Sequence, residues 1–333
     1  MSTARKSKEL YSELFVKLFG EKRAGEAWTR EDADFAYALQ QHCQQIICEL
    51  VTYYHRKYPD YNKLCIAGGV GLNCLINSAV AELNLFESVY VQPASNDAGT
   101  SLGASAYVMS DHQQVRPQRI MSPYLGPEFS EDDIQKCLDS RSDIYHEKCE
   151  NVYKHAADKL ANDQIIGWFQ GRMEFGPRAL GNRSILSSPC DAESRGRINA
   201  AIKRRELFRP LAPAVMDQYA SDYFEIFNNA RDMYPYMLSV VKTKGEKKEL
   251  IPATVHIDNS ARIQIVSPDT NKAFHNLLQE FFDITGVPVL LNTSFNIGNE
   301  PIVCTPDDAV NSFVNSNLDC CYIGNFYICR GEK

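Results

Sequence analysis

The residues best suited to chemistry lie in one cationic run between Arg172 and Arg209. This run holds nine Lys or Arg residues and four acids, a local balance of +5 in a chain whose net charge is -7. Arginine binds phosphate or carboxylate groups through two parallel hydrogen bonds, and lysine adds a compact point charge. The run therefore predicts a site for a polyanion such as a nucleotide or an acyl phosphate. A solvated basic face is the alternative that charge alone leaves open.

The order of residues within the run also points to anion binding. The segment GPRALG puts Gly176 and a proline directly before Arg178, which shapes the backbone for a close approach to a phosphate. Farther along, INAAIKRRELFRPLAP predicts a helix with Lys203 and Arg209 on it or just after it. Both segments are therefore expected to present cations at defined places.

The hydrophobic pattern predicts an α/β fold, in which helical and extended segments alternate along the chain. Helices are expected over residues 6–19, 31–57, 130–140, 150–161, 272–284 and 306–315. Strands are expected in the segments KLCIA, ESVYVQP, SDIYHE, QIIGWFQ, YMLSVVKT, ARIQIV, VPVLLNT and CYIGNFYIC. Between about 111 and 129 the chain loses its periodicity and gains Pro117, Pro123 and Pro127, which predicts a domain boundary there.

Composition bounds the cellular setting. The eleven cysteines include no C-x-x-C pair, so neither a disulfide framework nor a zinc site is indicated. We expect reduced thiols, most of them buried, in a cytoplasmic protein. The start MSTARKSKEL lacks the apolar stretch of a signal peptide, and no apolar run is long enough for a membrane span. The net charge of -7 argues against this chain alone gripping a nucleic-acid backbone.

Six ordered motifs carry a resemblance that extends over about residues 30 to 330. They are GGVGLNCLIN (68–77), PASNDAGTSLGAS (93–105), GRMEFGPRALGNRSIL, INAAIKRRELFRPLAPAVM, TVHIDNSARIQ and GVPVLLNTSFNIGNEPIVCTPDDA. In this order they resemble the signature series of the O-carbamoyltransferase family, which acts on nodulation factors and antibiotics.

The resemblance implies the domain organisation. Family members are similar to one another in having an actin- and sugar-kinase-like (ASKHA) domain that transfers the carbamoyl group, followed by a YrdC-like α/β domain that makes carbamoyl-adenylate. This sequence looks like a member that begins at the second half of the first domain. We therefore expect the C-terminal half of the actin-like domain over residues 1–115, a linker over 116–129 and the YrdC-like domain over 130–333.

In the second domain the resemblance assigns an anion site. It implies that Arg178, Lys203 and Arg209 bind ATP phosphates and carbamoyl phosphate and act as the catalytic residues. A further anion-binding arginine is implied at Arg262, and nucleotide contacts at Ser294 and Asn296. The alternatives are a surface ion pair for Arg262 and an ordinary turn for the other two. The segment SFNIGNEPIV also departs from the family, which usually has a basic residue where this chain has Gly298.

In the leading domain the resemblance implies a metal and a nucleotide contact. Asp97 corresponds to a metal ligand for iron or manganese, with Mg accompanying ATP. Gly68, Gly69 and Asn73 resemble the nucleotide-contacting turn. A helix N-cap at Asp97 and a tight strand-to-helix turn at residues 68–73 are the alternatives.

A second chain is also implied. The family's leading half-domain carries a phosphate-binding turn and a His-x-x-x-His motif, and no two of the seven histidines here lie four residues apart. We therefore expect a hetero-oligomer with a partner that supplies the N-terminal half of the actin-like domain.

The expected function is that of one subunit of a split O-carbamoyltransferase. It would form carbamoyl-adenylate from ATP and carbamoyl phosphate and transfer the carbamoyl group to an acceptor hydroxyl of a sugar, a polyketide or a hydroxymethylated nucleobase. A stand-alone carbamoyl-adenylate synthase and a non-catalytic regulatory subunit remain as alternatives.

Overall fold

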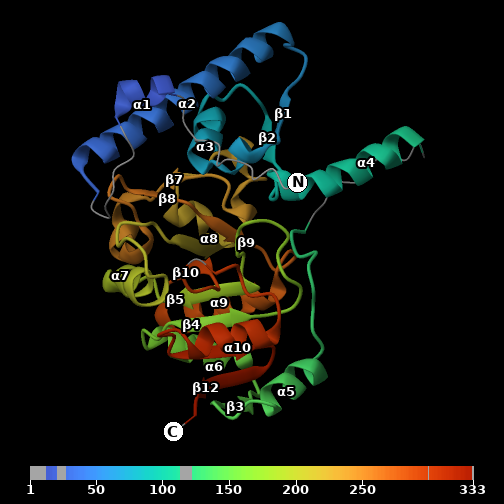
Figure 1. Cartoon of the computed structure of the whole chain (residues 1–333), viewed down its shortest axis with the longest axis vertical. Coiled ribbons are helices and arrows are strands. Elements are labelled where there is room, and N and C mark those ends of the chain that lie inside the picture. Colours follow the sequence, from blue (N-terminus) through green and yellow to red (C-terminus); the bar gives the residue numbers. More distant parts are fainter. Residues whose placement is uncertain (1–12, 21–27, 113–121, 299, 332–333) are drawn as a thin grey trace, which may run out of the picture. The chain divides into compact units, whose positions relative to one another are not determined.

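The computed structural model describes residues 13–20, 28–112, 122–298 and 300–331 (Figure 1). By their internal contacts, residues 1–45 and 46–333 form two compact units. In the first unit the described residues form α1 (Glu13–Phe19) and the first half of α2 (Arg30–Lys57), with the rings of Phe15, Phe19 and Phe35 in mutual contact. The second unit holds all the predicted site residues.

The leading part of the second unit contains a small parallel sheet. Its strands are β1 (Lys63–Ile66) and β2 (Ser88–Val91), and its helices are the short η1 (Gly69–Leu72), α3 (Cys74–Glu82), η2 (Asp97–Gly99) and α4 (Thr100–His112). In both motifs, at residues 68–77 and 93–105, a strand is therefore followed by a turn and then by a helix. The two turns at residues 66–73 and 91–97 follow parallel neighbouring strands, so they lie at the same edge of the sheet.

The larger sheet has eight strands among the described residues, in the order β3-β12-β11-β4-β5-β10-β6-β9. Only the pairs β11 with β4 and β6 with β9 are parallel. The strands are β3 (Ile144–Lys148), β4 (Ile166–Phe169), β5 (Arg183–Ser187), β6 (Ala212–Met216), β9 (Gln264–Val266), β10 (Val289–Ser294), β11 (Cys320–Ile323) and β12 (Phe326–Arg330). A separate ribbon pairs β7 (Val241–Lys242) with β8 (Ser260–Ala261).

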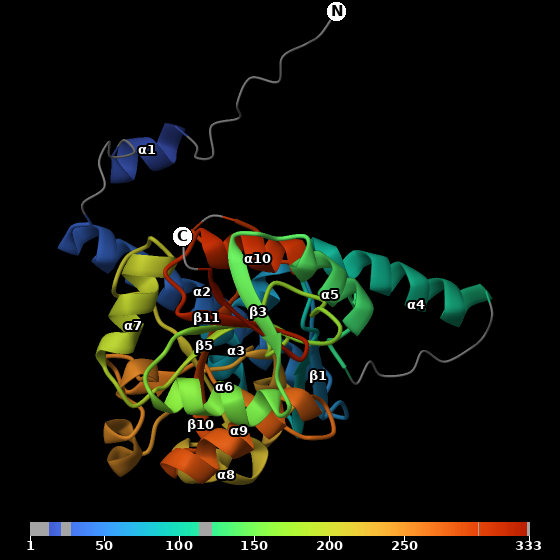
Figure 2. The ribbon, with the colours of Figure 1, turned by 90° about the horizontal axis from the view of Figure 1, so that it is seen from below.

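Helices cover both faces of the large sheet (Figure 2). On one face α6 (Val152–Ala161) packs against α9 (Lys272–Thr285), and on the other α5 (Glu131–Asp139) packs against α10 (Pro306–Val314). The remaining helices are α7 (Glu193–Arg197), the π-helix η3 (Ile198–Ile202), α8 (Asp217–Tyr223), η4 (Asn228–Ala230), η5 (Tyr234–Tyr236), η6 (Gly245–Glu249) and η7 (Pro252–Thr254). The predicted α/β class is thus confirmed.

Strand alternation separates the two cores. Phe169 and Ile185 belong to a buried cluster with Phe313 of α10, whereas Trp168 contacts Tyr153 of α6 on the opposite face. Because successive strand residues point to opposite faces, each strand contributes to both cores. The sheet is therefore buried on both sides, which gives rigid support to the loops at its edges.

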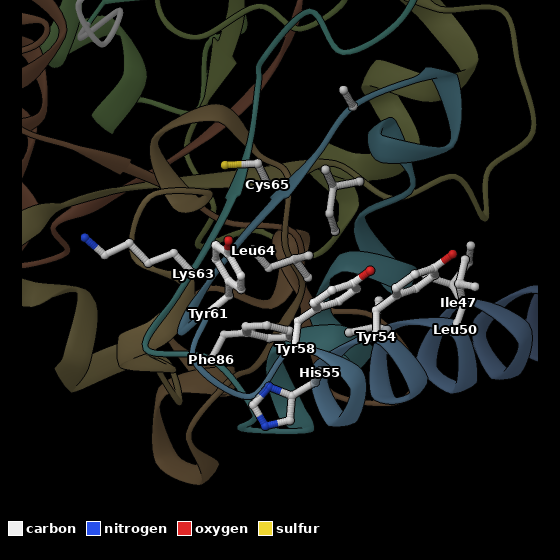
Figure 3. Close-up of a pocket in the computed structure, with 13 residues that line it drawn as sticks. Ile47, Leu50, Tyr54, His55, Tyr58, Tyr61, Lys63, Leu64, Cys65 and Phe86 are labelled. Carbon is white, nitrogen blue, oxygen red and sulfur yellow. The ribbon is translucent and has the colours of Figure 1, made fainter.

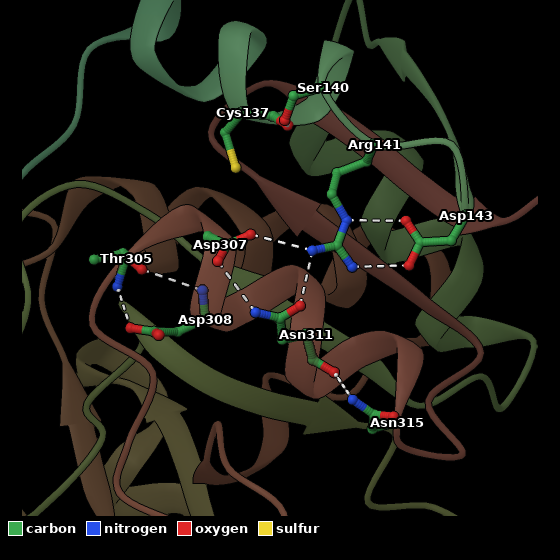
Figure 4. Close-up of polar contacts among 9 residues, drawn as sticks. All are labelled: Cys137, Ser140, Arg141, Asp143, Thr305, Asp307, Asp308, Asn311 and Asn315. Carbon is green, nitrogen blue, oxygen red and sulfur yellow. Dashed lines mark hydrogen bonds and ion pairs between the residues drawn. The ribbon is translucent and has the colours of Figure 1, made fainter.

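A cluster of polar side chains joins the segment directly after α5 to α10 (Figure 4). Arg141 donates to both carboxylate oxygens of Asp143, at 2.9 and 2.8 Å, and its Nη1 bonds to Asp307 and Asn311 of α10 at 3.1 and 2.8 Å. The guanidinium lowers the pKa of Asp143 through these hydrogen bonds. This cluster fixes helix packing far from the cations of residues 172–209.

The leading part packs directly on the later part of the second unit. The buried Asn77 of α3 donates to the carbonyls of Gly71 and Leu238, both at 2.9 Å. Ser78 bonds to Ser239 at 3.0 Å and to Val240. The domain boundary predicted at residues 116–129 stays a prediction, and residues 113–121 lie outside those described.

All eleven cysteines are described, and all are free thiols. Only Cys320 and Cys321 are buried, so the expectation that most would be buried was wrong. Cys65 and Cys190 are exposed, and the other seven are half-buried. None of the helices in the described part of the chain has both the length and the apolar character needed to cross a bilayer.

Candidate anion-binding site

Four arginines converge on one cavity of about 250 Å³ in the second unit. They come from three segments: Arg178 from the loop before β5, Arg205 and Arg209 from the segment after η3, and Arg262 from the link between β8 and β9. The rest of the lining consists of Pro177, Ala179, Pro210, Leu211, Ala212, Met237, Asn292, Thr293 and Ser294. Thus no described lining residue is an acid.

The loop that carries Arg178 is held by a buried carboxylate. Gly176 has φ of +132°, and a Cβ there would lie 3.0 Å from the carbonyl oxygen of Pro93, so glycine is required at this turn. Glu174 Oε1 accepts the backbone N–H groups of Leu180 and Asn182 at 2.6 and 2.8 Å, and a third at 3.3 Å. The sequence indicated the Gly-Pro turn. It did not indicate that Glu174, one of the four acids in the cationic run, holds this loop.

Arg178 is the most enclosed cation of the cavity. Burial, and then repulsion by Arg262, lowers its pKa to about 10, so it stays protonated at neutral pH. Its Nε is buried and has no hydrogen-bond partner in the described part of the protein. A buried, charged donor without a partner is costly. An anion in the cavity would supply the missing acceptor and offset the repulsion between the two arginines.

Arg205 and Arg209 reach the cavity from a tight turn at the end of η3. Arg209 donates from Nε to Glu206 at 2.7 Å, so its two terminal nitrogens are available to bind another group. Burial, followed by repulsion from Arg209 and Arg262, lowers the pKa of Arg205. Sequence reasoning counted Arg205 in the cationic run but assigned it no role, because nothing in KRREL distinguishes which arginine faces inward.

Ser294 and Arg262 both line the cavity, and the ligand contacts that the resemblance implied for them stay predictions. Ser294 ends β10, beside the buried Asn292, whose Nδ2 donates to Gln264 at 2.8 Å. Arg262 lines the cavity directly after β8. The alternative of a turn for Ser294 is thus replaced by a strand end, where side chains at a sheet edge commonly face ligands.

Lys203 occupies a different position from the one expected. It is only 3% exposed and does not line the cavity. Its ammonium donates to the backbone oxygen of Ser294, and to Ser294 Oγ, Asn296 O and Asn296 Oδ1 at 3.2, 2.9 and 2.6 Å. Lys203 therefore holds the end of β10 and the loop after it through hydrogen bonds to Ser294 and Asn296. Neither Lys203 nor Asn296 lines the arginines' cavity.

The candidate residues of the leading part lie at a second, larger cavity of about 1050 Å³. Gly68, with φ of +100°, and Asp97 line it, whereas Gly69 and Asn73 do not. Asn73 is the N-cap of α3 and accepts the N–H groups of Leu75 and Ile76. The strand-to-helix turn given as the alternative for residues 68–73 is therefore present, and the nucleotide contact stays a prediction. Asp97 begins η2 with an exposed side chain.

A metal at Asp97 does not fit the described residues. One exposed carboxylate lies there, and the described part of the chain contains no group of three His, Cys, Asp or Glu side chains that could hold an ion. A tight divalent site needs several such ligands. The iron or manganese assignment stays a prediction, and no step of the chemistry below depends on it.

An aromatic cavity of about 650 Å³ adjoins the small sheet (Figure 3). Its lining includes Tyr54 and His55 from α2, Tyr58 directly after α2, Leu64 of β1 and Phe86. This cavity lacks the clustered cations of the arginine site, so its chemistry is that of an apolar contact surface.

Comparison with known proteins defines the family. Residues 157–330 match the family model described as carbamoyltransferase C-terminus, and residues 5–106 match the one described as carbamoyltransferase N-terminus. The chain belongs to the carbamoyltransferase family. The family membership predicted from the six motifs, and with it the assignment to a family of enzymes, is confirmed.

Curated relatives match along most of this chain. It is 38% identical over 310 residues to nodulation protein NolNO of Sinorhizobium fredii, covering 92% of this chain and 45% of the relative. It is also 38% identical over 312 residues to nodulation protein NolO of Bradyrhizobium diazoefficiens, covering 92% of this chain and 56% of that one. The chain thus spans about half the length of these curated relatives.

Two solved structures are similar in part. HypF in its phosphate- and nucleotide-bound form gives a TM-score of 0.37 at 16% identity, covering 56% of this chain and 22% of that chain. A variant of P. abyssi Sua5 also gives 0.37, at 12% identity, covering 52% of this chain and 48% of that chain.

The expected hetero-oligomer with a separate N-terminal half-domain was wrong. The family's N-terminal model matches residues 5–106 of this chain, and each relative aligns with 92% of the chain as a single protein. The lack of a His-x-x-x-His motif in this sequence was therefore not evidence for a second polypeptide.

The buried ammonium of Lys203 predicts that ligand binding depends on pH. Burial, and then repulsion by Arg205, lowers the pKa of Lys203 to about 7. The lysine is charged below this pH and loses its proton above it, which leaves two N–H donors for four oxygens. We expect the affinity of the arginine cavity for inorganic pyrophosphate to weaken roughly tenfold from about pH 6 to about pH 9, as the end of β10 with Ser294 loosens.

Calorimetric titration of the wild type and Lys203→Met across this range would test the expectation. The protonation of pyrophosphate itself is common to both titrations, so only the difference between the curves reports Lys203. The variant should bind weakly at low pH and converge with the wild type at high pH. Parallel curves would rule out the hydrogen bonds of Lys203 as the cause of the pH dependence.

Proposed function

We propose that the arginine cavity binds ATP and carbamoyl phosphate and forms carbamoyl-adenylate, from which the carbamoyl group passes to an acceptor hydroxyl with AMP as the leaving group. Arg178, Arg205, Arg209 and Arg262 hold the phosphate groups. Ser294 Oγ, which here donates to Asn296 Oδ1 at 2.6 Å, exchanges this acceptor for a phosphate oxygen when the ligand binds. Lys203 and Asn296 hold the end of β10, which carries Ser294. The observation that carries this proposal is the convergence of four arginines on a cavity without a described acidic lining residue.

The size and charge of the cavity favour compact anions over a polymer. About 250 Å³ accommodates phosphate groups, while the chain's net charge of -7 disfavours a nucleic-acid backbone. The orphaned Nε of Arg178 is a further donor for such an anion. Membership of the carbamoyltransferase family then selects carbamoyl phosphate and ATP among the small phosphorylated ligands.

Formation of carbamoyl-adenylate has two steps. Water attacks the phosphorus of carbamoyl phosphate and breaks its bond to the bridging oxygen, which gives carbamate, inorganic phosphate and a proton that goes to the solvent. A carbamate oxygen then attacks the α-phosphorus of ATP: one P–O bond forms, the bond between the α-phosphorus and the bridging oxygen breaks, and pyrophosphate leaves. The arginines orient both anions and stabilise the charge that develops on the leaving pyrophosphate. None of these events needs a side-chain base in the cavity.

Pyrophosphate release tests the proposal. A coupled assay should detect pyrophosphate only when ATP and carbamoyl phosphate are both present. Acetyl phosphate, which lacks the carbamoyl nitrogen, serves as the matched co-substrate control. Release with ATP alone, or none under any condition from a folded protein that binds ATP, would refute the proposed synthesis.

A further inference from the structure

The turn that presents Arg205 and Arg209 is organised around one buried side chain, Asn199. Asn199 lies in the π-helix η3 and is 0% exposed. Its neighbours Ile198 and Ile202 belong to the main buried cluster, which anchors this helical turn to the sheet. π-helical turns are uncommon and occur frequently at functional sites.

All the side-chain hydrogen bonds of Asn199 go to residues 205–209. Its Nδ2 donates to the carbonyls of Leu207 and Arg209 at 3.3 and 2.9 Å, and its Oδ1 accepts from Arg205 Nε at 2.9 Å. Its backbone carbonyl accepts the N–H of Arg205 at 3.0 Å. Between these contacts Arg204 takes φ of +47°, a left-handed conformation that side chains rarely adopt.

The two arginines are held in the same manner. Arg205 uses Nε for Asn199, and Arg209 uses Nε for Glu206 at 2.7 Å. In neither does a terminal guanidinium nitrogen have a hydrogen-bond partner among the described residues. A guanidinium fixed through Nε keeps its terminal pair for an anion in the cavity.

We propose that Asn199 is a positioning residue that aims Arg205 and Arg209 at a phosphate-bearing ligand, and that Arg205 contacts this ligand directly. The inference rests on the proposed function of the arginine cavity, which it deepens. Asn199 itself touches no ligand. It acts by fixing the start and the end of the segment that bears both arginines.

Calorimetric titration with inorganic pyrophosphate tests the inference. Asn199→Ala should weaken binding tenfold or more, because both arginines lose their anchor. Asn151→Ala is the matched control: it removes the two side-chain hydrogen bonds of the α6 N-cap, and Asn151 does not line the cavity. It should lower the melting temperature and leave pyrophosphate binding within about twofold of wild type.

Two further variants separate positioning from general destabilisation. Arg205→Lys keeps the charge but cannot use Nε for Asn199 and the terminal pair for an anion, so it should also lose about tenfold in affinity. In an Arg205→Ala background, Asn199→Ala should have a clearly smaller effect than in the wild type, because the two residues act together.

The outcomes distinguish this inference from the proposed function. Wild type that binds pyrophosphate, with Asn199→Ala or Arg205→Lys binding equally well, would overturn the role of Asn199 and Arg205 alone. Full additivity of the two substitutions would also overturn it. A folded wild type that binds no pyrophosphate would refute the proposed function and this inference together. If Asn199→Ala does not fold, Arg205→Lys decides.

Discussion

Replacing Arg178 with alanine is expected to slow pyrophosphate release tenfold to a hundredfold while the protein stays folded. Arg178 lines the cavity, and its buried Nε has no partner among the described residues. Removing this side chain takes a charge-assisted contact from the ligand, while relieving the repulsion from Arg262 in the free protein. The rate of pyrophosphate release should therefore fall, whereas the free energy of unfolding should stay the same or rise.

Arg172 offers the matched control for this experiment. It is an exposed arginine in the same loop, donates to the carbonyl of Leu125 at 3.2 Å and does not line the cavity. Arg172→Ala should keep the rate within about twofold of wild type. Equal losses in both variants would mean that net charge, and not the geometry of the cavity, controls the reaction.

The second large effect is expected at Glu174, which is 6% exposed. Glu174→Ala would leave the N–H groups of Leu180, Asn182 and Arg183 without their acceptor. Each buried donor left unpaired costs roughly 1–3 kcal/mol, so the free energy of unfolding should fall by about 3 kcal/mol or more. Pyrophosphate release should fall with it, since the same loop carries Arg178.

Urea denaturation of Glu174→Ala and Glu174→Gln would measure this effect. Glutamine retains one carbonyl oxygen at the position of Oε1, and burial already raises the pKa of Glu174 and disfavours its charge. The glutamine variant should therefore lose less than half as much stability as the alanine variant. Similar losses would show that the charge, and not the three accepted hydrogen bonds, is what the loop needs.

Much of the secondary structure was predictable because periodicity is a local signal. The helix expected over residues 31–57 is α2 (Arg30–Lys57), and those expected over 272–284 and 306–315 are α9 and α10. Strand β6 was not predicted because it contains Pro213, and proline is unusual inside a sheet. Pro213 nevertheless pairs with Leu291 inside the sheet. Strand β5 was missed because it begins with Arg183, which is fully buried despite its charge.

The candidate site was predictable in its chemistry and less so in its geometry. The cationic run and the motifs pointed to Arg178, Arg209, Arg262 and Ser294, which the fold brings together. Lys203 is turned away because its partners lie about ninety residues later, after β10. No local pattern contains such a contact. The actin-like and YrdC-like assignments of the two parts, and the metal at Asp97, remain predictions.

The central claim is that this chain joins carbamate to the α-phosphorus of ATP. Incubation with ATP and carbamoyl phosphate labelled at the carbonyl carbon, followed by chromatography of the nucleotides, tests it most directly. The account predicts carbon label in a nucleotide that yields AMP on hydrolysis, together with an equal amount of pyrophosphate, and loss of both in Arg178→Ala. Label that never enters a nucleotide, or ATP cleaved to ADP and phosphate, would contradict it.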